Sequence, residues 1–332
     1  MARVAVTGGT GFVGANLVRR LLAEGDEVHL LVRPGHHTWR LDDVLDDLHR
    51  REVDLAARDE LAALVHVMAP DQVFHLAAHG AYPWQTDEPA IRATNVIGTD
   101  NLVHACVSAG VRAFVHTGSS SEYGARDHAP TEDEAAQPAS YYGLTKAWGT
   151  LACRLAGFTT LRLYSVYGPW EDPRRFVPQL VEHALEGRLP PLAHPGTARD
   201  FVHVDDVVDA LLLAAAADAD VDAAEASTAH VDAEGASGTS ATGHPHPGPV
   251  YNVGTGVQTT LREAVAVARQ VLGLDVEPAW DTLAPRPWDT DVWVADRRRI
   301  ERDLGWRPRI GFAEGLARTV EWHRAQQQAG QG

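Results

Sequence analysis

Tyr142 and Lys146 stand four residues apart and form a pair of side chains that could carry acid–base chemistry. On a helix, residues at this spacing share one face, one turn apart. A lysine ammonium near a phenol favours the phenolate and lowers the pKa of the phenol. Tyrosine could then exchange a proton with a sugar or alcohol hydroxyl near neutral pH. The same spacing is common on ordinary helix faces, so the pair alone does not establish a reaction.

Three serines, Ser119, Ser120 and Ser121, precede this pair and follow a predicted buried strand at residues 113–117. A serine hydroxyl at the carboxyl end of a strand can hydrogen-bond the substrate oxygen with which the tyrosine exchanges its proton. Each feature is common by itself. The combination of serines, tyrosine and lysine becomes a specific signal of a catalytic site when a glycine-rich turn precedes it in the chain.

Such a turn lies near the N-terminus, where Gly8, Gly11 and Gly14 lie between a predicted strand at residues 3–7 and a predicted helix at residues 13–24. Glycine permits a tight turn and a close approach of the backbone to a pyrophosphate. The helix N-terminus offers free N–H groups and the positive end of its dipole. This strand–turn–helix context is the one in which the motif binds dinucleotides. The alternative is a purely structural turn.

The end of the second predicted strand, residues 27–32, bears on the choice of cofactor. A carboxylate at that position hydrogen-bonds the adenosine ribose of NAD. This chain instead has Arg33, and Arg40 follows on the same connection. A guanidinium suits a ribose 2′-phosphate, so the sequence predicts NADP(H), with NAD(H) as the alternative. The other interpretation of Arg33 is a solvated charge after a strand.

The elements that must position these residues alternate between short apolar segments and helical patterns. This alternation predicts the α/β class, with a doubly wound parallel sheet that has helices on both faces. The predicted strands lie at residues 3–7, 27–32, 72–77, 113–117 and 160–164. The predicted helices lie at residues 13–24, 177–186, 204–217, 261–272 and 313–325.

The composition limits the classes of function. The 332 residues include 45 acidic and 29 basic side chains, a formal net charge of −16. Such a chain repels phosphate backbones, so we expect no nucleic-acid partner. No apolar run reaches the roughly 18 residues of a membrane span, and the N-terminus lacks signal-peptide anatomy. The two cysteines, Cys106 and Cys153, fit a reducing cytoplasm.

Residues 218–249 differ from the rest of the chain in composition. They are rich in Ala, Gly, Ser and Thr and contain neither Lys nor Arg. Their acidic residues are Asp218, Asp220, Asp222, Glu225, Asp232 and Glu234. Because the segment has few apolar residues to offset the entropy of ordering, we expect a flexible, low-complexity surface insertion. His230, His244 and His246 could bind a metal, but the composition favours a solvated loop.

Together these features resemble the extended short-chain dehydrogenases/reductases, in their nucleotide-sugar epimerase/dehydratase group. The landmarks occur in order at residues 7–14, 54–55, 75–78, 95–99, 117–124, 142–146, 161–169 and 199–206, with Arg286 and Asp289 beyond. The resemblance implies a Rossmann domain for a nicotinamide cofactor, a smaller C-terminal α/β cap for a nucleotide-diphosphate sugar, and a homodimer. We expect the Rossmann domain at residues 1–170 with 199–217 returning to it, and the cap at residues 171–198 and 250–328.

The resemblance also implies roles for single residues. Tyr142 is the expected general acid/base, Lys146 its partner, and Ser119 the catalytic serine. The expected cofactor-binding residues are Gly8, Thr10, Gly11, Phe12, Val13, Gly14, Arg33, Asp54, Leu55, Leu76, Ala77, Ala78, Asn95, Tyr142 and Lys146. The expected substrate-binding residues are His79, Ser120, Ser165, Phe176, Arg199 and Arg286. Ser165 departs from the asparagine of many members, and no catalytic metal is expected.

The choice of reaction depends on the residues after Ser119. Sugar-nucleotide 4,6-dehydratases have an Asp-Glu pair there, whereas this chain has Ser120 and Ser121, with Glu122 one place late. A 4,6-elimination needs a base and an acid, so the ungapped register disfavours a dehydratase, although a one-residue gap would restore Glu122. The sequence favours an NADPH-dependent 4-ketoreductase of a 4-keto-deoxysugar. A 4-epimerase with tightly bound cofactor is the alternative, and a non-catalytic NADP-binding scaffold is a third interpretation.

Overall fold

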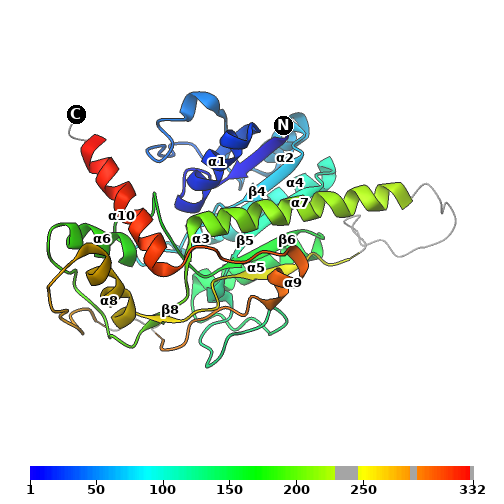
Figure 1. Ribbon diagram of the computed structural model, residues 1–332. Helices are drawn as coiled ribbons and strands as arrows, with labels where there is room; N and C mark the ends of the chain where they lie inside the picture. Colours follow the sequence, from blue (N-terminus) through cyan, green and yellow to red (C-terminus); the bar gives the residue numbers. More distant parts are fainter. Residues whose placement is uncertain (229–245, 285–289, 330–332) are drawn as a thin grey trace. The chain divides into compact units, whose positions relative to one another are not determined.

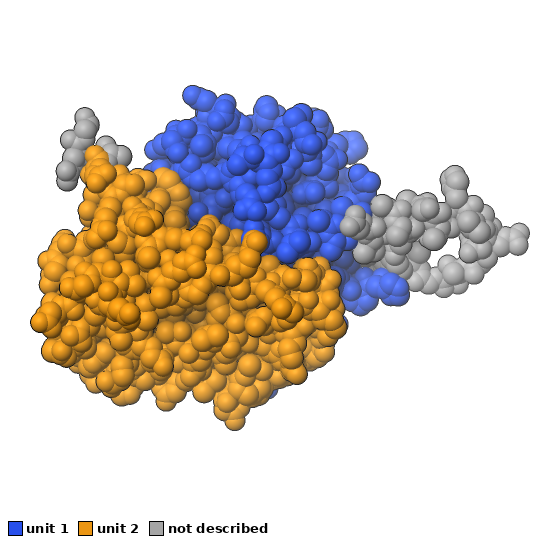
Figure 2. Space-filling model, viewed as in Figure 1, with its two compact units in different colours: residues 1–124, 135–162, 208–251 blue, residues 125–134, 163–207, 252–332 orange. Residues whose placement is uncertain are grey.

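The computed structural model describes residues 1–228, 246–284 and 290–329. The chain forms two compact units, shown in different colours in Figure 2. Unit 1 comprises residues 1–124, 135–162 and 208–251, and unit 2 comprises residues 125–134, 163–207 and 252–332. Among the described residues, no helix has the length and apolar character needed to span a membrane.

The main sheet has seven strands in the order β10-β6-β5-β4-β1-β2-β3 (Figure 1). They are β1 (Arg3–Thr7), β2 (Glu27–Val32), β3 (His49–Glu52), β4 (Gln72–His75), β5 (Ala113–Ser119), β6 (Thr159–Leu163) and β10 (Val250–Val253). The pairs β1/β2, β1/β4, β2/β3 and β4/β5 are parallel. The strand order reverses between β1 and β4, and in such sheets ligands bind beyond the carboxyl ends of the strands at that point. The predicted α/β fold of Rossmann type is confirmed.

Helices cover this sheet because its inner strands, such as β1 and β5, are buried on both faces, whereas the edge strand β3 is exposed throughout. The helices of unit 1 are α1 (Phe12–Glu24), α2 (Arg58–Met68), α3 (Glu88–Arg92), α4 (Thr99–Ala109), α5 (Tyr141–Leu155) and most of α7 (Val204–Thr228). Leu61 of α2, Leu102 of α4 and Cys153 of α5 share one buried core with Ala5 and Phe114 of the strands. These three helices therefore lie on the same face of the sheet.

Unit 2 has its own core. The helices α6 (Phe176–Leu185), α8 (Leu261–Leu272) and α10 (Phe312–Ala329) pack together through Val181, Val265 and Leu316. Two small sheets accompany them: β7 (Ser165–Tyr167) with β9 (Phe201–His203), and β8 (Ala198–Arg199) with β11 (Thr259–Thr260). A short helix, α9 (Arg298–Leu304), belongs to the same unit.

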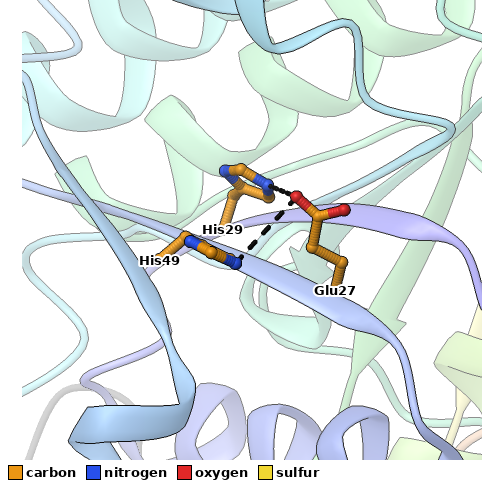
Figure 3. A group of neighbouring side chains, drawn as sticks. All are labelled: Glu27, His29 and His49. Carbon is orange, nitrogen blue, oxygen red and sulfur yellow. Dashed lines mark hydrogen bonds and ion pairs between the residues drawn. The ribbon is translucent and has the colours of Figure 1, made fainter.

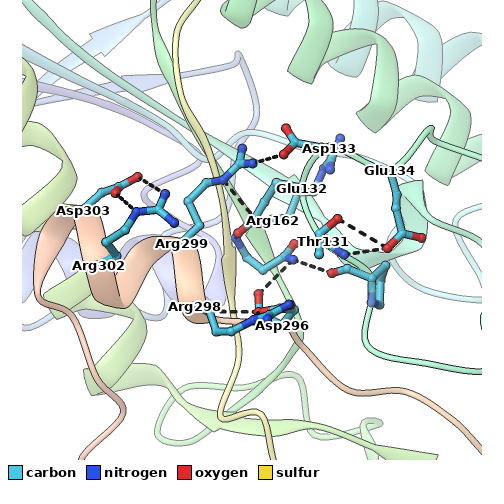
Figure 4. A network of polar contacts seen from close by, with 12 residues as sticks. Thr131, Glu132, Asp133, Glu134, Arg162, Asp296, Arg298, Arg299, Arg302 and Asp303 are labelled. Atoms are coloured by element: carbon cyan, nitrogen blue, oxygen red, sulfur yellow. Dashed lines mark hydrogen bonds and ion pairs between the residues drawn. The ribbon is translucent and has the colours of Figure 1, made fainter.

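Residues 125–134 belong to unit 2, although the expected domain boundary places them with residues 1–170. A network of polar contacts, shown in Figure 4, holds them there. Glu132 Oε1 accepts a hydrogen bond from the backbone N–H of Asn252 at 2.9 Å, and the Asn252 side chain donates to Pro130 O at 2.9 Å. Arg299 of α9 pairs with Asp133. These contacts join segments more than 100 residues apart, so local sequence patterns do not reveal them.

The helix α7 is longer than predicted, continuing to Thr228 instead of ending at residue 217. Residues 218–228 thus continue the helix, where the sequence suggested the start of a low-complexity loop. Alanine has the highest helix propensity, and this stretch alternates alanine with acidic residues. At its start, Asp218 accepts a hydrogen bond from the Thr159 hydroxyl at 2.6 Å. Residues 229–245, with His230 and His244, lie outside the described residues, and His246 is exposed.

Candidate active site

The glycine turn between β1 and α1 is packed so closely that side chains would not fit. A Cβ on Gly8 would lie 2.5 Å from the backbone N of Ala77, and Gly8 has φ +68°. A Cβ on Gly14 would lie 2.2 Å from Gly8 O. Gly11 caps α1 without a side-chain hydrogen bond, and the first turn of this helix has no acidic residue. The first N–H groups of α1 are thus available to an anion, which fits the phosphates of a dinucleotide.

The other residues expected at the cofactor lie around this turn. Thr10, Phe12 and Val13 are half-buried in it, whereas Leu76, Ala77 and Ala78 follow β4 beside Gly8. Thr7 at the end of β1 is hydrogen-bonded to His75 at 2.7 Å, and His75 to Thr99 at 2.8 Å. These buried contacts fix β4 and α4 against the turn.

Asn95 has a structural role in unit 1. Its side-chain oxygen accepts a hydrogen bond from His79 N at 2.8 Å, and its Nδ2 donates to His79 O at 2.8 Å and to Thr145 Oγ1 at 2.9 Å. The amide thereby ties the segment after β4 to α5. It orients His79, which is itself half-buried.

The connection after β2 folds back to the glycine turn. The Arg40 guanidinium lies over the Trp39 ring and donates a hydrogen bond to Thr10 O at 3.4 Å. Arg19 of α1 donates to Arg40 O at 2.7 Å and thereby fixes this loop from the other side. Arg33 is exposed at the carboxyl end of β2.

Asp54 and Leu55 follow β3 at the same edge of the sheet. Asp54 is exposed, and its Oδ1 accepts a hydrogen bond from Ala56 N at 2.9 Å. The side chain of Asn101 donates to Leu55 O at 2.9 Å, which fixes this turn on α4.

Tyr142 and Lys146 lie on α5, whose first turn is capped by Ser140 through a hydrogen bond from Gly143 N at 3.0 Å. Tyr142 is half-buried, whereas Lys146 is 3% exposed. The Lys146 ammonium donates a hydrogen bond to Nε2 of His116 on β5 at 3.1 Å. Gly149 leaves room for this contact, because a Cβ there would lie 3.2 Å from His116 Nε2.

Burial controls the proton states of Lys146 and His116. It lowers the pKa of Lys146 to about 8, against the opposing effect of the Glu122 carboxylate. Burial, followed by the charge of Lys146, holds the pKa of His116 well below its usual range. The neutral imidazole therefore accepts the hydrogen bond from the lysine ammonium. His116 was not among the site residues expected from the sequence, although a histidine in an otherwise apolar central strand was the available signal.

Ser119 begins a short capped turn at the end of β5. Its hydroxyl accepts a hydrogen bond from Ser121 N at 3.1 Å, and its own N–H donates to Glu122 Oε1 at 2.8 Å. Glu122 is fully buried and pairs with Arg162 of β6 at 2.8 Å. It also accepts a hydrogen bond from Thr150 at 2.9 Å. Ser119 and Ser120 are both buried at the carboxyl edge of the sheet.

Of the described residues expected at the substrate, His79 and Ser120 lie in unit 1, and Ser165, Phe176 and Arg199 lie in unit 2. Ser165 N donates to Asp200 O at 3.0 Å, and Phe176 begins α6. Arg199 donates to Ala198 O at 2.6 Å and lies over the Trp293 ring. Arg286 lies outside the described residues.

The neighbour of Arg199, Asp200, has a structural role in unit 2. Its two carboxylate oxygens accept hydrogen bonds from the backbone N–H groups of Thr255, Gly256 and Ala295, at 2.7, 2.9 and 3.0 Å. The Thr255 hydroxyl donates to Oδ1 at 2.6 Å. The buried carboxylate thus ties residues 255–256 and 295 to the residue that precedes β9.

Comparisons with known proteins agree with this arrangement. Residues 4–227 match the family model of the NAD dependent epimerase/dehydratase family. The chain is 34% identical to a UDP-glucose 4-epimerase of Mycolicibacterium smegmatis, over 98% of this chain and 100% of that protein. It is 29% identical to a dTDP-glucose 4,6-dehydratase of Streptomyces griseus, over 96% and 93%.

Solved structures show the same likeness. MoeE5 in complex with UDP-glucuronic acid and NAD is 32% identical, with a TM-score of 0.76 over 98% of this chain and 99% of that one. The dTDP-glucose 4,6-dehydratase DesIV of Streptomyces venezuelae, with NAD and TYD bound, is 29% identical, with a TM-score of 0.78 over 98% of each chain. The sequence, the glycine turn and the sheet together place this chain in the NAD-dependent epimerase/dehydratase family.

Proposed function

We propose that this protein is an NADPH-dependent 4-ketoreductase of a nucleotide-diphosphate 4-keto-deoxysugar. The observation that carries the proposal is the segment after β2. It has arginines at positions 33 and 40 and no carboxylate between residues 32 and 41. Arg40 is held against the glycine turn through Thr10 O. Two guanidinium groups on the connection after β2 suit a 2′-phosphate better than a free ribose hydroxyl.

The chain's own residues have distinct tasks in this proposal. A nicotinamide dinucleotide supplies the hydride when it is bound. The Tyr142 hydroxyl donates its proton to the keto oxygen that is being reduced, and the Ser119 hydroxyl hydrogen-bonds the same oxygen. Lys146 stabilises the phenolate that remains and contacts the ribose. The Arg199 guanidinium is the proposed partner of the diphosphate of the substrate.

The surroundings of Glu122 support a reductase over a dehydratase. A 4,6-elimination needs a carboxylate that can take a proton from the sugar. Glu122 is fully buried, and both of its oxygens are engaged, by Ser119 N and the Thr150 hydroxyl on one side and Arg162 on the other. The positions directly after Ser119 carry only hydroxyl groups.

A 4-epimerase is the second candidate. The 34% identity with the mycobacterial UDP-glucose 4-epimerase extends over 98% of this chain and all of that protein, and the complexes of two similar solved structures contain NAD. An epimerase uses the same tyrosine and lysine, because it removes and returns a hydride at one carbon without net redox change.

One incubation separates the candidates. The protein is mixed with NADPH and UDP-, dTDP-, CDP- and GDP-sugars, with and without a 4-keto group, and absorbance at 340 nm and product stereochemistry are followed. We expect NADPH loss equal to the keto sugar consumed, at a rate about 10²–10⁴-fold lower with Tyr142→Phe. Isomerisation without added cofactor would identify an epimerase instead. No turnover across the panel would favour the non-catalytic scaffold.

We also propose a homodimer that forms through α5. Four exposed apolar side chains recur on the face of this helix opposite Tyr142 and Lys146. They are Leu144, Trp148, Leu151 and Leu155, and they are 53%, 37%, 57% and 74% exposed. A second copy would bury this stripe. Light scattering should give a dimer for the parent and a monomer for the double substitution Leu151→Glu and Leu155→Glu, whereas Val67→Glu on α2 should stay dimeric.

A cytoplasmic location is part of the proposal. It is supported by Cys106 and Cys153, which are both free and buried, as expected of a chain that folds in a reducing compartment.

A further inference from the structure

The register of β2 and β3 brings a carboxylate and two imidazoles together on one face of the sheet edge (Figure 3). Glu27 and His29 are two residues apart on β2, so their side chains point to the same face. His49 begins β3 and is the direct partner of His29 in the parallel pairing. One nitrogen or oxygen atom from each of the three lies within 4.8 Å of the others.

We propose that Glu27, His29 and His49 bind one divalent transition-metal ion such as Zn²⁺. Imidazole nitrogen and carboxylate oxygen are ligands that this ion prefers, and three protein ligands leave one position for water. Because His49 is on the exposed side of the cluster, with 53% of its side chain accessible, water can reach that position.

The distances suit an ion after small shifts. Glu27 Oε1 lies 2.7 Å from His29 Nε2 and 4.0 Å from His49 Nε2. With metal–ligand bonds of about 2.0–2.2 Å, two ligand atoms on one tetrahedral ion lie about 3.4 Å apart. The two observed distances bracket this value. The imidazole rings are stacked with centroids 4.8 Å apart, and a rotation of the exposed His49 side chain can bring both nitrogens to the ion.

The charges around the cluster are compatible with an ion. Imidazole coordinates a metal ion in its neutral form. The hydrogen bond from His29 is the main cause that lowers the pKa of Glu27. Arg3 lies 3.5 Å from the same carboxylate and competes with a cation, but its side chain is 42% exposed and can turn to solvent. Arg51, two residues after His49 on β3, is the second nearby positive charge.

The tautomer of His29 does not oppose binding. Among the described residues its Nδ1 has no hydrogen-bond partner. Coordination through Nε2 requires the imidazole proton to be on Nδ1. Nδ1 therefore lacks a hydrogen-bond partner both before the ion binds, as an acceptor, and afterwards, as a donor. The number of unsatisfied buried groups stays the same.

The proposed site is separate from the candidate active site. Glu27 and His49 are the first residues of their strands, whereas the glycine turn and Arg33 follow the carboxyl ends of β1 and β2. An ion here would tie the four-residue edge strand β3 to β2. The proposal therefore does not depend on the proposed reductase activity.

The test is a Zn²⁺ titration of the full chain in competition with a zinc-binding dye. The variants are His49→Ala, Glu27→Gln and, as a matched control, His104→Ala, which removes an exposed histidine beside a carboxylate on α4. Substitution of residues that only hydrogen-bond a metal ligand already weakens metal binding about 10–100-fold, and loss of a ligand should weaken it at least as much. We therefore expect the tightest zinc site to weaken roughly tenfold or more in both cluster variants and to be unchanged in the control.

Thermal unfolding gives a second readout. Zn²⁺ should raise the unfolding temperature of the parent and of His104→Ala, and not that of His49→Ala, because an ion stabilises only the folded state that binds it. Binding at His230, His244 and His246 would be the same in the parent and in both cluster variants. Equal zinc affinity in the parent, His49→Ala and Glu27→Gln would overturn the proposal, as would the absence of saturable binding to the parent.

Discussion

Lys146 donates a hydrogen bond to His116 Nε2 across 3.1 Å inside unit 1. The lysine is 3% exposed, and the histidine is completely buried. An ammonium group in such a place depends on the few acceptors that surround it. The proton state of Lys146, and with it the charge next to Tyr142, is therefore governed by burial, which the nearby Glu122 carboxylate opposes.

This burial predicts the pH dependence of turnover. Burial lowers the pKa of Lys146 to about 8, so the group is positive below that pH and neutral above it. Because the proposed mechanism needs the positive charge, kcat/KM should fall as the pH rises through about 8. An exposed lysine would keep its charge to about pH 10. A profile measured at saturating NADPH that stays level to pH 10 would contradict this assignment.

The contact itself is tested by two substitutions of His116. His116→Phe keeps an aromatic ring at this position but removes the hydrogen-bond acceptor. Leaving the buried ammonium without that acceptor should destabilise its charged form by about 1–3 kcal/mol. At 1.36 kcal/mol per unit, this should move the alkaline limb of the profile to lower pH by roughly 1–2 units. His116→Gln keeps an oxygen acceptor and should leave the limb close to that of the parent. Identical profiles for the two variants would mean that the hydrogen bond has no influence.

How far the sequence predicts this structure depends on how local each feature is. β1, β2 and α8 have the predicted bounds. The signals that predict them are runs of apolar residues, the helical spacing of apolar residues and flanking glycines, and all of these act within about 12 residues of the chain. The contact of His116 with Lys146 joins residues 30 apart and depends on how α5 packs on β5, which no local pattern encodes. At residues 218–228, low apolar content suggested a loop, and the high helix propensity of alanine prevailed.

The cofactor choice is tested at Arg33. A charge-assisted contact with a 2′-phosphate contributes about 1.5–3 kcal/mol, so Arg33→Ala should weaken NADPH binding roughly tenfold or more. The affinity for NADH should change little, since NADH has no phosphate at that position. Arg40→Ala should act in the same direction, and it also removes the contact with Thr10 O. Fluorescence titration measures both cofactors, and equal weakening of the two would show that Arg33 does not bind the 2′-phosphate.

The ion pair of Glu122 with Arg162 predicts a stability effect. Both side chains are at most 7% exposed. Glu122→Gln leaves the Arg162 charge buried without its counter-ion, which should destabilise the fold by roughly 3–5 kcal/mol. The double substitution Glu122→Gln with Arg162→Met removes both charges and should recover much of that loss. Thermal denaturation of the three proteins provides the measurement, and a single variant as stable as the parent would show that the pair is dispensable.

The connection between α7 and β10 can be shortened in two ways. Loop-closure entropy depends only weakly on length, so a short linker in place of residues 229–245 should change stability by about 1 kcal/mol at most. Replacing residues 218–245 also removes the last helical turns of α7 and the Asp218 contact with Thr159. This larger deletion should lower the unfolding temperature more than the smaller one. The prediction is wrong if the small deletion alone abolishes folding or turnover.

The assignment of Tyr142 gives the most direct test of the chemistry. Tyr142→Phe removes only the hydroxyl that passes the proton, and general acid–base catalysis contributes about 10²–10⁴-fold. Turnover should fall within that range while NADPH still binds. Lys146→Ala should reduce turnover and also weaken the cofactor, because lysine has both tasks. Ser119→Ala should have the smallest effect, since the hydrogen bond from Tyr142 to the substrate oxygen remains.

These three variants share a control in cofactor titration, which separates a lost reaction from a lost binding site. Tyr142→Phe with unchanged NADPH affinity and impaired turnover fits a proton donor. Lys146→Ala must show both defects, because in the proposed mechanism its ammonium both stabilises the Tyr142 phenolate, one helical turn away, and contacts the ribose of the cofactor. If Tyr142→Phe retains near-parental turnover on a substrate that the parent reduces, the proton comes from another group. The tyrosine–lysine spacing would then be no more than one face of α5.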